Sequence, residues 1–427
     1  MKRLNLPNAP SQADYVVTMA LICLSGNMVV SGSDRRDVFF VLFAAAMMLR
    51  MALLRRPPPR RLVILLVAFA VLFALQSAAL NFFAPVTIAG FFIKLIGAAG
   101  AMATIRNFRL AFVRCMVWIT KLSFVFWVPT ALASLAHISI AEVFRPLANI
   151  IGVVVTGPNE RLNIILYNFQ VGDHGYRNSA FFWEPGAFNG YLILGILLLG
   201  TMRGAIPPKL RKSWTLWLVA GVLSTFSTTG FVILPLALVL FILARPATQR
   251  ALANNAIRLA ALMIVLVPVS FYAWQLDFIG PKIIELWTRA VNRDTGWELS
   301  RFGSIIFDWA YFVERPILGW GQNTATQFAL NPELERFALG NGLSGYIRQL
   351  GLTGITLFIV SLWIGLKQIG TGPIARAWFI IVVLLLLNGE YFLDYPLFLA
   401  LHFLADRRPL VRPVFRHSLP SSERTFA

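Results

Sequence analysis

The chain has 427 residues, of which 58% are hydrophobic and only 13% are charged. Soluble domains carry roughly 45–50% apolar and about 25% charged residues, so this composition excludes a soluble globular protein and indicates a polytopic membrane protein. The formal net charge of +19 is concentrated in short loops between apolar runs. That distribution is typical of basic cytoplasmic loops and not of a nucleic-acid-binding face, so no nucleic-acid partner is expected.

The predicted membrane spans follow one another closely along the chain. A helix needs about 20 mainly apolar residues to cross the hydrocarbon of a bilayer. The N-terminal Met-Lys-Arg before the first run also resembles the start of a signal peptide, but we expect an uncleaved first span, because its removal would disturb the topology. We therefore expect about twelve transmembrane helices, at residues 15–31, 38–54, 62–80, 86–105, 113–136, 187–202, 214–227, 229–244, 258–276, 343–366, 377–391 and 393–405.

Basic residues in the connectors orient these spans, because lysine and arginine favour the cytoplasmic side of a membrane. Placing all basic connectors in the cytoplasm gives twelve crossings, puts both termini inside, and makes residues 406–427 a cytoplasmic basic tail. Two basic connectors stay on the same side of the membrane only if an even number of spans lies between them. Residues 214–244 are therefore expected to form two spans that turn at Ser224–Gly230, and residues 377–405 two spans that meet near Leu393. The basic connectors contain Arg55, Arg56, Arg60, Arg61, Arg106, Arg109, Arg203, Lys209, Arg211, Lys212, Arg245, Arg250, Arg258, Lys367 and Arg376.

Two connectors on the other side are long, at about residues 137–186 and 277–342. Within them, residues 141–155 and 300–314 have the pattern of short amphipathic helices on the outer face. Most of the remaining charged residues lie in these two loops, so any chemistry is expected on the outer side. The predicted fold class is an all-α polytopic integral membrane protein, with residues 1–427 in a single membrane domain.

The first long loop ends in YRNSAFFWEPGAFNGY, residues 176–191, which places an arginine and a glutamate at the start of a span. One interpretation is structural: Glu184 precedes a Pro-Gly step, a carboxylate is favourable at a helix N-terminus, and the aromatic residues before it form an interfacial belt. The functional interpretation is that Arg177 binds an anionic group and that Glu184 orients it or accepts a proton.

The second long loop carries three arginines, Arg289, Arg293 and Arg301, followed by the Pro/Gly turn RPILGWGQN at residues 315–323. Arginine binds phosphate through paired hydrogen bonds and keeps its charge, and an arginine cluster on the outer face runs against the usual distribution. An anionic ligand would explain the cluster. The alternative is that these arginines pair with acidic side chains of the same loop or with lipid head groups.

Further polar residues lie at the start of the tenth span and inside other spans. Asn341 begins the tenth span, where ordinary helix-start chemistry also explains it, and Tyr346, Arg348 and Gln349 follow. Ionisable residues inside a bilayer are costly, so they are expected to be paired or functional. Those found within spans are Lys94, Lys121, Glu390 and Asp394, and the last two are candidates for a shared cavity at the outer end of the eleventh span.

Other classes of site have little support in the sequence. His174 can shuttle protons near neutral pH, although a single loop histidine is more often an ordinary surface residue. No nucleotide-binding motif is present, and His and Cys are too few and too scattered for a metal site, Cys23 and Cys115 included. No cofactor is therefore expected, and any reaction would use a substrate that has been activated beforehand.

At these residues the chain resembles the O-antigen polymerase and ligase superfamily (Wzy and WaaL proteins), which includes related exopolysaccharide polymerases. The resemblance covers about residues 160–365 and the twelve-span layout. It rests on four elements in order: RNSAFFWEPGAF; the turn STTG; Arg301 with Trp309 and PILGWG; and Gly340-Asn341 followed by Gly351. Each element alone is weak, but the four in sequence within the predicted outer loops are fairly specific.

One position departs from the pattern of the ligases in this superfamily. Where they carry a histidine before the asparagine, this chain has Gly340. The difference favours the polymerase side, and it leaves Glu184, His174 or Asp394 as the candidate general base.

The resemblance implies an enzyme of the bacterial cytoplasmic membrane that acts at the periplasmic face. It would transfer an oligosaccharide from a polyprenyl pyrophosphate to a sugar hydroxyl on a second lipid-linked unit, without a metal. Arg177 and Arg301 would stabilise the departing pyrophosphate, and Glu184 would orient Arg177 or take the acceptor proton. The further substrate contacts expected are Arg289, Asn341, Tyr346, Arg348, Trp183 and Trp320.

Other functions remain open at this stage. A ligase of the same superfamily would attach the glycan to a lipid A core or to a protein. A secondary transporter of a polar or anionic solute is the main rival from another class, but the sequence lacks a convincing inverted repeat and matching broken spans. A glycan-binding membrane scaffold without activity is a further alternative. A chain-length regulator is a candidate partner besides the lipid-linked oligosaccharide and the bilayer.

Overall fold

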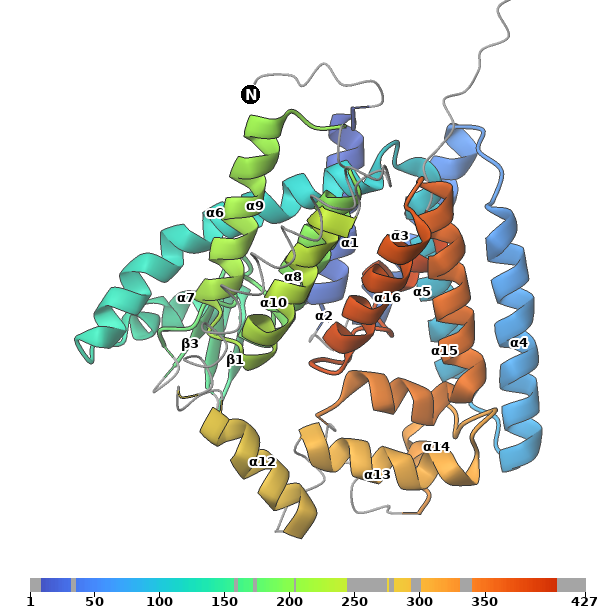
Figure 1. The fold of residues 1–427 in the computed structure, drawn as a ribbon. Coiled ribbons are helices and arrows are strands. Elements are labelled where there is room, and N and C mark those ends of the chain that lie inside the picture. The colour runs from blue at the N-terminus through green and yellow to red at the C-terminus, as the bar shows by residue number, and fades with distance from the viewer. Residues whose placement is uncertain are drawn as a thin grey trace, which may run out of the picture.

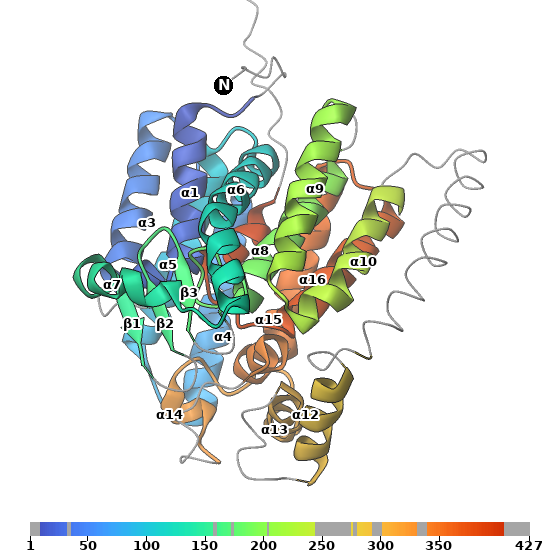
Figure 2. The same cartoon turned by 90° about the vertical axis from the view of Figure 1, so that its left-hand side faces the viewer.

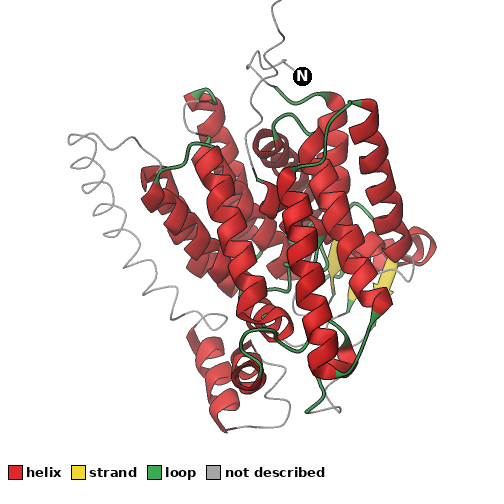
Figure 3. Ribbon diagram, turned by 90° about the vertical axis from the view of Figure 1, so that its right-hand side faces the viewer, coloured by secondary structure: helices red, strands yellow, loops and turns green. Residues whose placement is uncertain are grey.

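The computed structural model describes residues 9–31, 36–156, 160–171, 175–202, 205–243, 275, 280–292, 301–330 and 340–404. This part of the chain is mainly helical, in agreement with the predicted helical fold class (Figure 3). Within it, four helices are long and apolar enough to cross a membrane, which supports a membrane-embedded protein: α4 (Arg60–Leu80), α5 (Pro85–Thr104), α6 (Phe108–Leu135) and α15 (Gly342–Gln368).

The other helices of the bundle are shorter. The apolar ones are α1 (Gln12–Gly26), α8 (Pro185–Thr201), α10 (Thr228–Leu243) and α16 (Pro373–Leu387). The remaining ones are α2 (Met28–Ser31), α3 (Arg36–Leu53), α9 (Pro208–Ser224), α17 (Pro396–Ala400) and the 3-10 helix η5 (Leu401–Phe403). The predicted turn after Ser224 is present, since α9 ends there and α10 begins at Thr228.

Two predicted spans are not seen as such. Residues 258–276 lie almost entirely outside the described residues. Residues 393–405 do not form one spanning helix, because α17 and η5 together cover only Pro396–Phe403. At about 1.5 Å per residue such a segment is far shorter than the roughly 30 Å of hydrocarbon. The described helices therefore do not make up twelve crossings.

The bundle has two chemically different ends (Figure 1). The connectors α3–α4, α5–α6, α8–α9 and α15–α16 lie at the upper end, and these are connectors for which the sequence predicts a cytoplasmic location. The start of α6 is tied to the end of α8 there, because Arg109 donates to the Thr201 hydroxyl over 3.2 Å. The elements of the two long loops lie at the opposite, lower end (Figures 1 and 2).

Helix α8 forms the centre of the bundle. Every residue from Pro185 to Gly200 is buried, and the helix packs against α6, α9, α10 and α16. A helix that is apolar on all sides requires such an enclosed position. Peripheral helices instead expose apolar side chains where lipid would lie, for example Ile64 on α4 and Val125 on α6. The first residue before α8, Glu184, therefore lies where the interior of the bundle meets the lower end.

The first long loop contains a small sheet that the sequence did not predict. The 3-10 helix η1 (Ile140–Phe144) and α7 (Arg145–Ile151) agree with the predicted amphipathic helix, but residues 153–155 form a strand. Three consecutive valines favour an extended backbone, which explains the early end of the helix. The antiparallel order is β1 (Val153–Val155), β2 (Arg161–Asn163) and β3 (Asn168–Gln170), with Leu162 paired to Val154 and Phe169 (Figure 2).

The second long loop is largely helical in its described part. Helices α12 (Gly280–Asn292), α13 (Arg301–Glu314) and α14 (Thr324–Gln327) lie below the bundle in Figure 1. The predicted amphipathic helix over residues 300–314 is confirmed, since α13 buries Phe307 and Tyr311 and exposes Trp309 and Val313.

Helix α15 is broken at Gly351, which has φ +62° and ψ −166°. The break exposes backbone groups, and the turn 316–321 satisfies them. Trp320 and Gly321 donate their N–H groups to the carbonyls of Arg348 and Gln349, each over 2.9 Å, while Leu352 donates to the Pro316 carbonyl over 2.8 Å. The motif PILGWG and Gly351 therefore connect α13 to α15 through these backbone hydrogen bonds. We call this connection the joint between α13 and α15.

Candidate functional site

Glu184 is the residue that precedes α8, as the sequence predicts, but its side chain does not cap the helix. It has an extended backbone, with φ −158° and ψ 165°, and makes no side-chain hydrogen bond to the first turn. Its carbonyl oxygen accepts from the N–H of Phe188. The carboxyl group is therefore directed to other partners, which argues against the purely structural interpretation.

The main partner of Glu184 is Glu390, in the loop between α16 and α17. The two carboxyl groups lie close enough to act on each other electrostatically. Both lie over Gly186 in the first turn of α8, where an added Cβ would come within 2.7 Å of Glu390 Oε1 and 3.2 Å of Glu184 Oε1. Gly342, at the start of α15, lies directly against the Glu390 carbonyl, and a side chain there would collide with it. Gly186 therefore leaves space for the two carboxyl groups, and Gly342 leaves space for the backbone that carries Glu390.

Two arginines contact the pair directly and a third lies close to it. Arg301, at the start of α13, places Nη2 3.2 Å from Glu390 Oε1. Arg161, on β2, places Nη2 3.6 Å from Glu184 Oε2 and donates to the Trp183 carbonyl over 2.5 Å. The charge of Arg177 also acts on Glu184. We call these five side chains the arginine–carboxyl cluster: Arg161, Arg177, Glu184, Arg301 and Glu390.

The turn between α9 and α10 holds two of these arginines. Arg177 Nε donates to the Thr225 carbonyl over 3.2 Å, and Arg301 Nη1 donates to the Thr229 hydroxyl over 2.5 Å. Among the described residues, the bond to Thr225 is the one hydrogen bond that the Arg177 guanidinium makes. The predicted turn STFSTTG thus orients arginines from two loops that are far apart in sequence.

The two carboxyl groups have opposite pKa shifts. Burial, and then the charge and hydrogen bond of Glu184, raise the pKa of Glu390 well above its ordinary value, against the opposing effects of Arg301 and Trp183. Burial also raises the pKa of Glu184, but the hydrogen bond with Glu390 and the charges of Arg161, Arg301 and Arg177 outweigh it and leave that pKa lowered. Such a separation is expected when two carboxyl groups share one small site.

Among the other predicted site residues, two border the cluster. Trp183 is half-buried, helps to lower the pKa of Glu390 and stacks on Tyr395 with ring centroids 5.3 Å apart. Asn341 is the N-cap of α15, as ordinary helix-start chemistry suggests, and its amide donates to the Asn388 side chain over 3.1 Å. Asn388 lies two residues before Glu390, so Asn341 helps to position the loop that carries this carboxyl.

The remaining predicted residues are bound within the protein, exposed elsewhere or not described. Arg289 is exposed on α12 and pairs with Glu285. Trp320 is buried and donates to the Tyr311 carbonyl, so it offers no open face to a sugar, and Tyr346 is buried in α15. His174 lies outside the described residues.

Asp394 forms an ion pair with Lys94, with 2.6 Å between Oδ2 and Nζ. This pair accounts for the predicted intramembrane lysine, which lies on α5. It also commits Asp394 to a partner within the protein, which weakens its case as a general base. Lys121, the other intramembrane lysine, lies over the ring of Trp217, with Nζ 5.1 Å from the ring centroid.

Arg348 is part of the joint between α13 and α15 and not of the cluster. It is buried, its Nε lies 2.7 Å from Asp308 Oδ1, and its Nη1 donates to the Gln327 carbonyl over 2.6 Å. The predicted pairing of a loop arginine with Asp308 therefore occurs, but through Arg348. A guanidinium that is committed to these partners has little capacity left for a substrate.

This joint should make the stability of the protein depend on pH. Burial raises the pKa of Asp308 from 3.8 to about 6, against the opposing effects of Arg348 and Ser344. Because the folded protein binds this proton more tightly than the unfolded chain does, the contribution is fully present below about pH 4 and is lost as the pH rises to about 6. We expect the unfolding temperature of wild type relative to Asp308→Asn to fall across this window. A constant difference from pH 4 to 7 would contradict the prediction.

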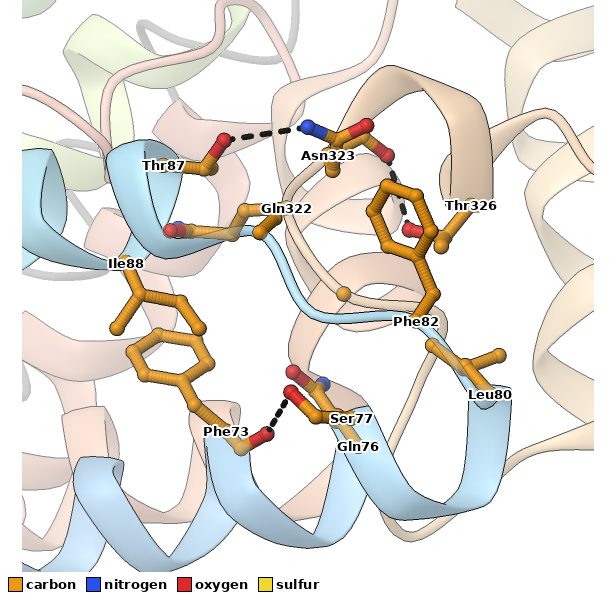
Figure 4. Close-up of a pocket in the computed structure, with 12 residues that line it drawn as sticks. Phe73, Gln76, Ser77, Leu80, Phe82, Thr87, Ile88, Gln322, Asn323 and Thr326 are labelled. Atoms are coloured by element: carbon orange, nitrogen blue, oxygen red, sulfur yellow. Dashed lines mark hydrogen bonds between the residues drawn. The ribbon is translucent and has the colours of Figure 1, made fainter.

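Two cavities lie near the lower end. The smaller, of about 30 Å³, lies between α4, α5 and residues 321–326, where Asn323 points toward Thr87 (Figure 4). It has room for a few water molecules at most and not for a sugar. The larger is an apolar groove of about 500 Å³, lined by Trp127, Val128, Ala131, Leu132 and Leu135 of α6 together with Tyr176 and Phe226. Tyr176 precedes Arg177 in sequence, and Phe226 follows Thr225, whose carbonyl accepts from Arg177.

Sequence reasoning did not find two features of the cluster. Arg161 was not singled out, although it is a further arginine in an outer loop and so carries the same signal as Arg177 and Arg301. Glu390 was expected to share a cavity with Asp394, but not to contact Glu184. Among the described residues, no group of three or more His, Cys, Asp or Glu residues could hold a metal ion.

Comparison with known proteins adds no assignment. No protein-family model matches the chain, and neither the curated proteins nor the solved structures gave a significant match to it.

Proposed function

We propose that the protein is a bacterial surface-polysaccharide polymerase, which transfers an oligosaccharide from a polyprenyl pyrophosphate to an acceptor sugar on a second lipid-linked unit. The observation that carries the proposal is the arginine–carboxyl cluster. Three guanidinium groups face two carboxyl groups at the mouth of an otherwise apolar bundle, so the cluster has an excess of positive charge. An anion that enters there would be stabilised by paired, charge-assisted hydrogen bonds.

The charge would act mainly on the transition state of the transfer. The bond between the anomeric carbon and the pyrophosphate oxygen breaks, and negative charge builds up on the departing oxygen. Arginines fixed in advance at this position stabilise the developing charge more than they stabilise the bound ester, which is the condition for a faster reaction. The turn between α9 and α10 fixes Arg177 and Arg301 in this way. The pyrophosphate is already an activated leaving group, so the reaction needs no nucleotide.

The surroundings of the cluster suit a lipid-linked substrate. The apolar groove beside Arg177 can accept part of a polyprenyl chain, since pockets of roughly 300–1,000 Å³ are typical of ligand sites. The partly exposed ring of Trp183 offers a face for a sugar ring near Glu390. The basic connectors α3–α4, α5–α6 and α15–α16 lie at the other end of the bundle, which under the positive-inside rule supports a periplasmic location of the cluster at the cytoplasmic membrane.

Deletion of the gene tests this function. Surface polysaccharide from the deletion strain, separated on a gel, is expected to contain single repeat units in place of long polymer, and a plasmid copy should restore the polymer. Full-length glycan that stays on the carrier lipid would instead identify a ligase. An unchanged polysaccharide profile would contradict both functions and favour a transporter or a binding protein.

A further inference from the structure

The carboxyl pair is the part of the cluster that anion binding does not explain. A site that served only to hold pyrophosphate would be stronger without carboxylates, because their negative charge repels the ligand. Yet Glu184 and Glu390 lie close together among three arginines, on elements far apart in the chain, and Gly186 leaves space for both carboxyl groups. The arrangement therefore indicates a second task in the same site.

The close approach of the two carboxyl groups over Gly186 favours one proton between them. Two ionised carboxylates in one small site repel each other, whereas one protonated group can donate a hydrogen bond to one carboxylate. The charged groups around the pair are Arg161 on β2, Arg177 in the segment before α8 and Arg301 on α13. Glu390 in turn acts on Tyr395, the residue before α17.

We propose that Glu184 and Glu390 share one proton and together form the acid–base group of the transfer reaction. Glu390 holds the shared proton, because Glu184 is close to the charges of both Arg161 and Arg177. Glu184 is the ionised member and accepts a second proton from the acceptor hydroxyl. This inference rests on the proposed transfer reaction and adds Glu390 to it as a positioning residue that acts through Glu184.

The step balances as follows. The acceptor oxygen forms a bond to the anomeric carbon of the donor sugar while the bond from that carbon to the pyrophosphate oxygen breaks. The electron pair of the broken bond leaves with the polyprenyl pyrophosphate, whose charge faces the arginines. The hydroxyl proton moves to Glu184, and both carboxyl groups are then neutral. Loss of one proton to water restores the starting state.

Neutralising the pair during the step also helps the reaction electrostatically. Before transfer, the carboxylate of Glu184 offsets part of the positive charge of the arginines. Once Glu184 has taken the proton, that charge is fully available to the departing pyrophosphate, when it is most needed. Proton transfer and leaving-group stabilisation thereby become coupled, and general-base assistance of this kind contributes about 100- to 10,000-fold to a rate.

Infrared spectroscopy of the purified protein tests the shared proton without any assay of activity. At neutral pH we expect a band from a protonated carboxyl group that shifts in heavy water. The band should be lost in Glu390→Gln and retained in Glu142→Gln, where an exposed carboxylate paired with Arg145 is changed. A band that persists unchanged in Glu390→Gln would overturn the proposal.

The pH dependence of polymer formation tests the catalytic role. Wild type should lose activity at low pH, as Glu184 is protonated, and at high pH, as Glu390 loses its proton. Glutamine at position 390 resembles the protonated acid, so Glu390→Gln should retain activity within about 10-fold and lose the alkaline decline, whereas Glu184→Gln should fall by about 100- to 10,000-fold. An unchanged alkaline decline in Glu390→Gln would overturn the role. Failure of wild type to form polymer would instead refute the proposed function. The infrared band would still show whether Glu184 and Glu390 share a proton.

Discussion

Replacement of Arg301 by alanine is expected to reduce polymer formation by roughly 100- to 1,000-fold, the usual effect of removing one donor that stabilises developing charge. Arg301 bonds both the Thr229 hydroxyl and Glu390, so it is fixed before substrate arrives. Arg177→Ala should have an effect of similar size. The measurement is the length and amount of polysaccharide in a deletion strain that expresses each variant at the wild-type level in the membrane.

The substitutions around Arg301 separate phosphate binding from simple charge. Arg301→Lys keeps the charge but loses the paired donors, so we expect it to restore little of the activity. Arg145→Ala is the matched control, because Arg145 lies in the same outer region but pairs with Glu142 and Glu160 away from the cluster. Wild-type polymer from Arg301→Lys would contradict a bidentate phosphate role. Equal loss from Arg145→Ala would show that the assay reports general charge or folding.

The substitution Gly351→Ala is expected to prevent normal accumulation of the protein. Its φ and ψ lie in a region essentially restricted to glycine, where another residue costs about 1–3 kcal/mol. An added Cβ would also collide with the Ile317 carbonyl, in the turn whose hydrogen bonds complete the break in α15. Size-exclusion profiles and unfolding temperatures of the detergent-solubilised protein measure the loss.

Two other glycines distinguish strain from collision. Gly370 also has a positive φ, of +80°, but a Cβ there meets nothing within 4 Å, so Gly370→Ala should cost only about 1–2 kcal/mol. Gly372 has neither a positive φ nor a close neighbour, and Gly372→Ala should be close to wild type. If Gly351→Ala lowered the stability no more than Gly370→Ala, the turn 316–321 would not depend on the close approach of residue 351 to the Ile317 carbonyl.

The sequence predicts the helices of this protein better than its loops. Spans such as α4 and α5 are long apolar runs. A helix must have about 20 apolar residues to cross the bilayer, so such a span can be recognised directly in the sequence. The small sheet depends on the pairing of Leu162 with Val154 and with Phe169. No local sequence pattern predicts these contacts. The segment after Tyr395 was mistaken for a span because buried and lipid-facing apolar residues look alike in a sequence.

The candidate site was predictable in its residue types but not in its pairings. Arg177, Arg301 and Glu184 were predicted as site residues because charged side chains at the edge of a membrane are costly unless they are paired or bind a ligand. These three residues do belong to one cluster. Arg348 and Trp320 were chosen by the same reasoning, yet they stabilise the joint between α13 and α15. An arginine in a buried structural ion pair and an arginine of the arginine–carboxyl cluster carry the same sequence signal, and only tertiary contacts distinguish them.

The position of Glu390 has a consequence for biosynthesis. Ribosomes release a membrane protein from its N-terminus onward, and Glu184 emerges with α8 long before the loop after α16 does. Until that loop arrives, Glu184 faces Arg161 and Arg177 alone, and Arg301 lacks its carboxylate partner. The arginine–carboxyl cluster is therefore completed near the end of translation, and a chain that stops before the last helices would lack the carboxyl group of Glu390.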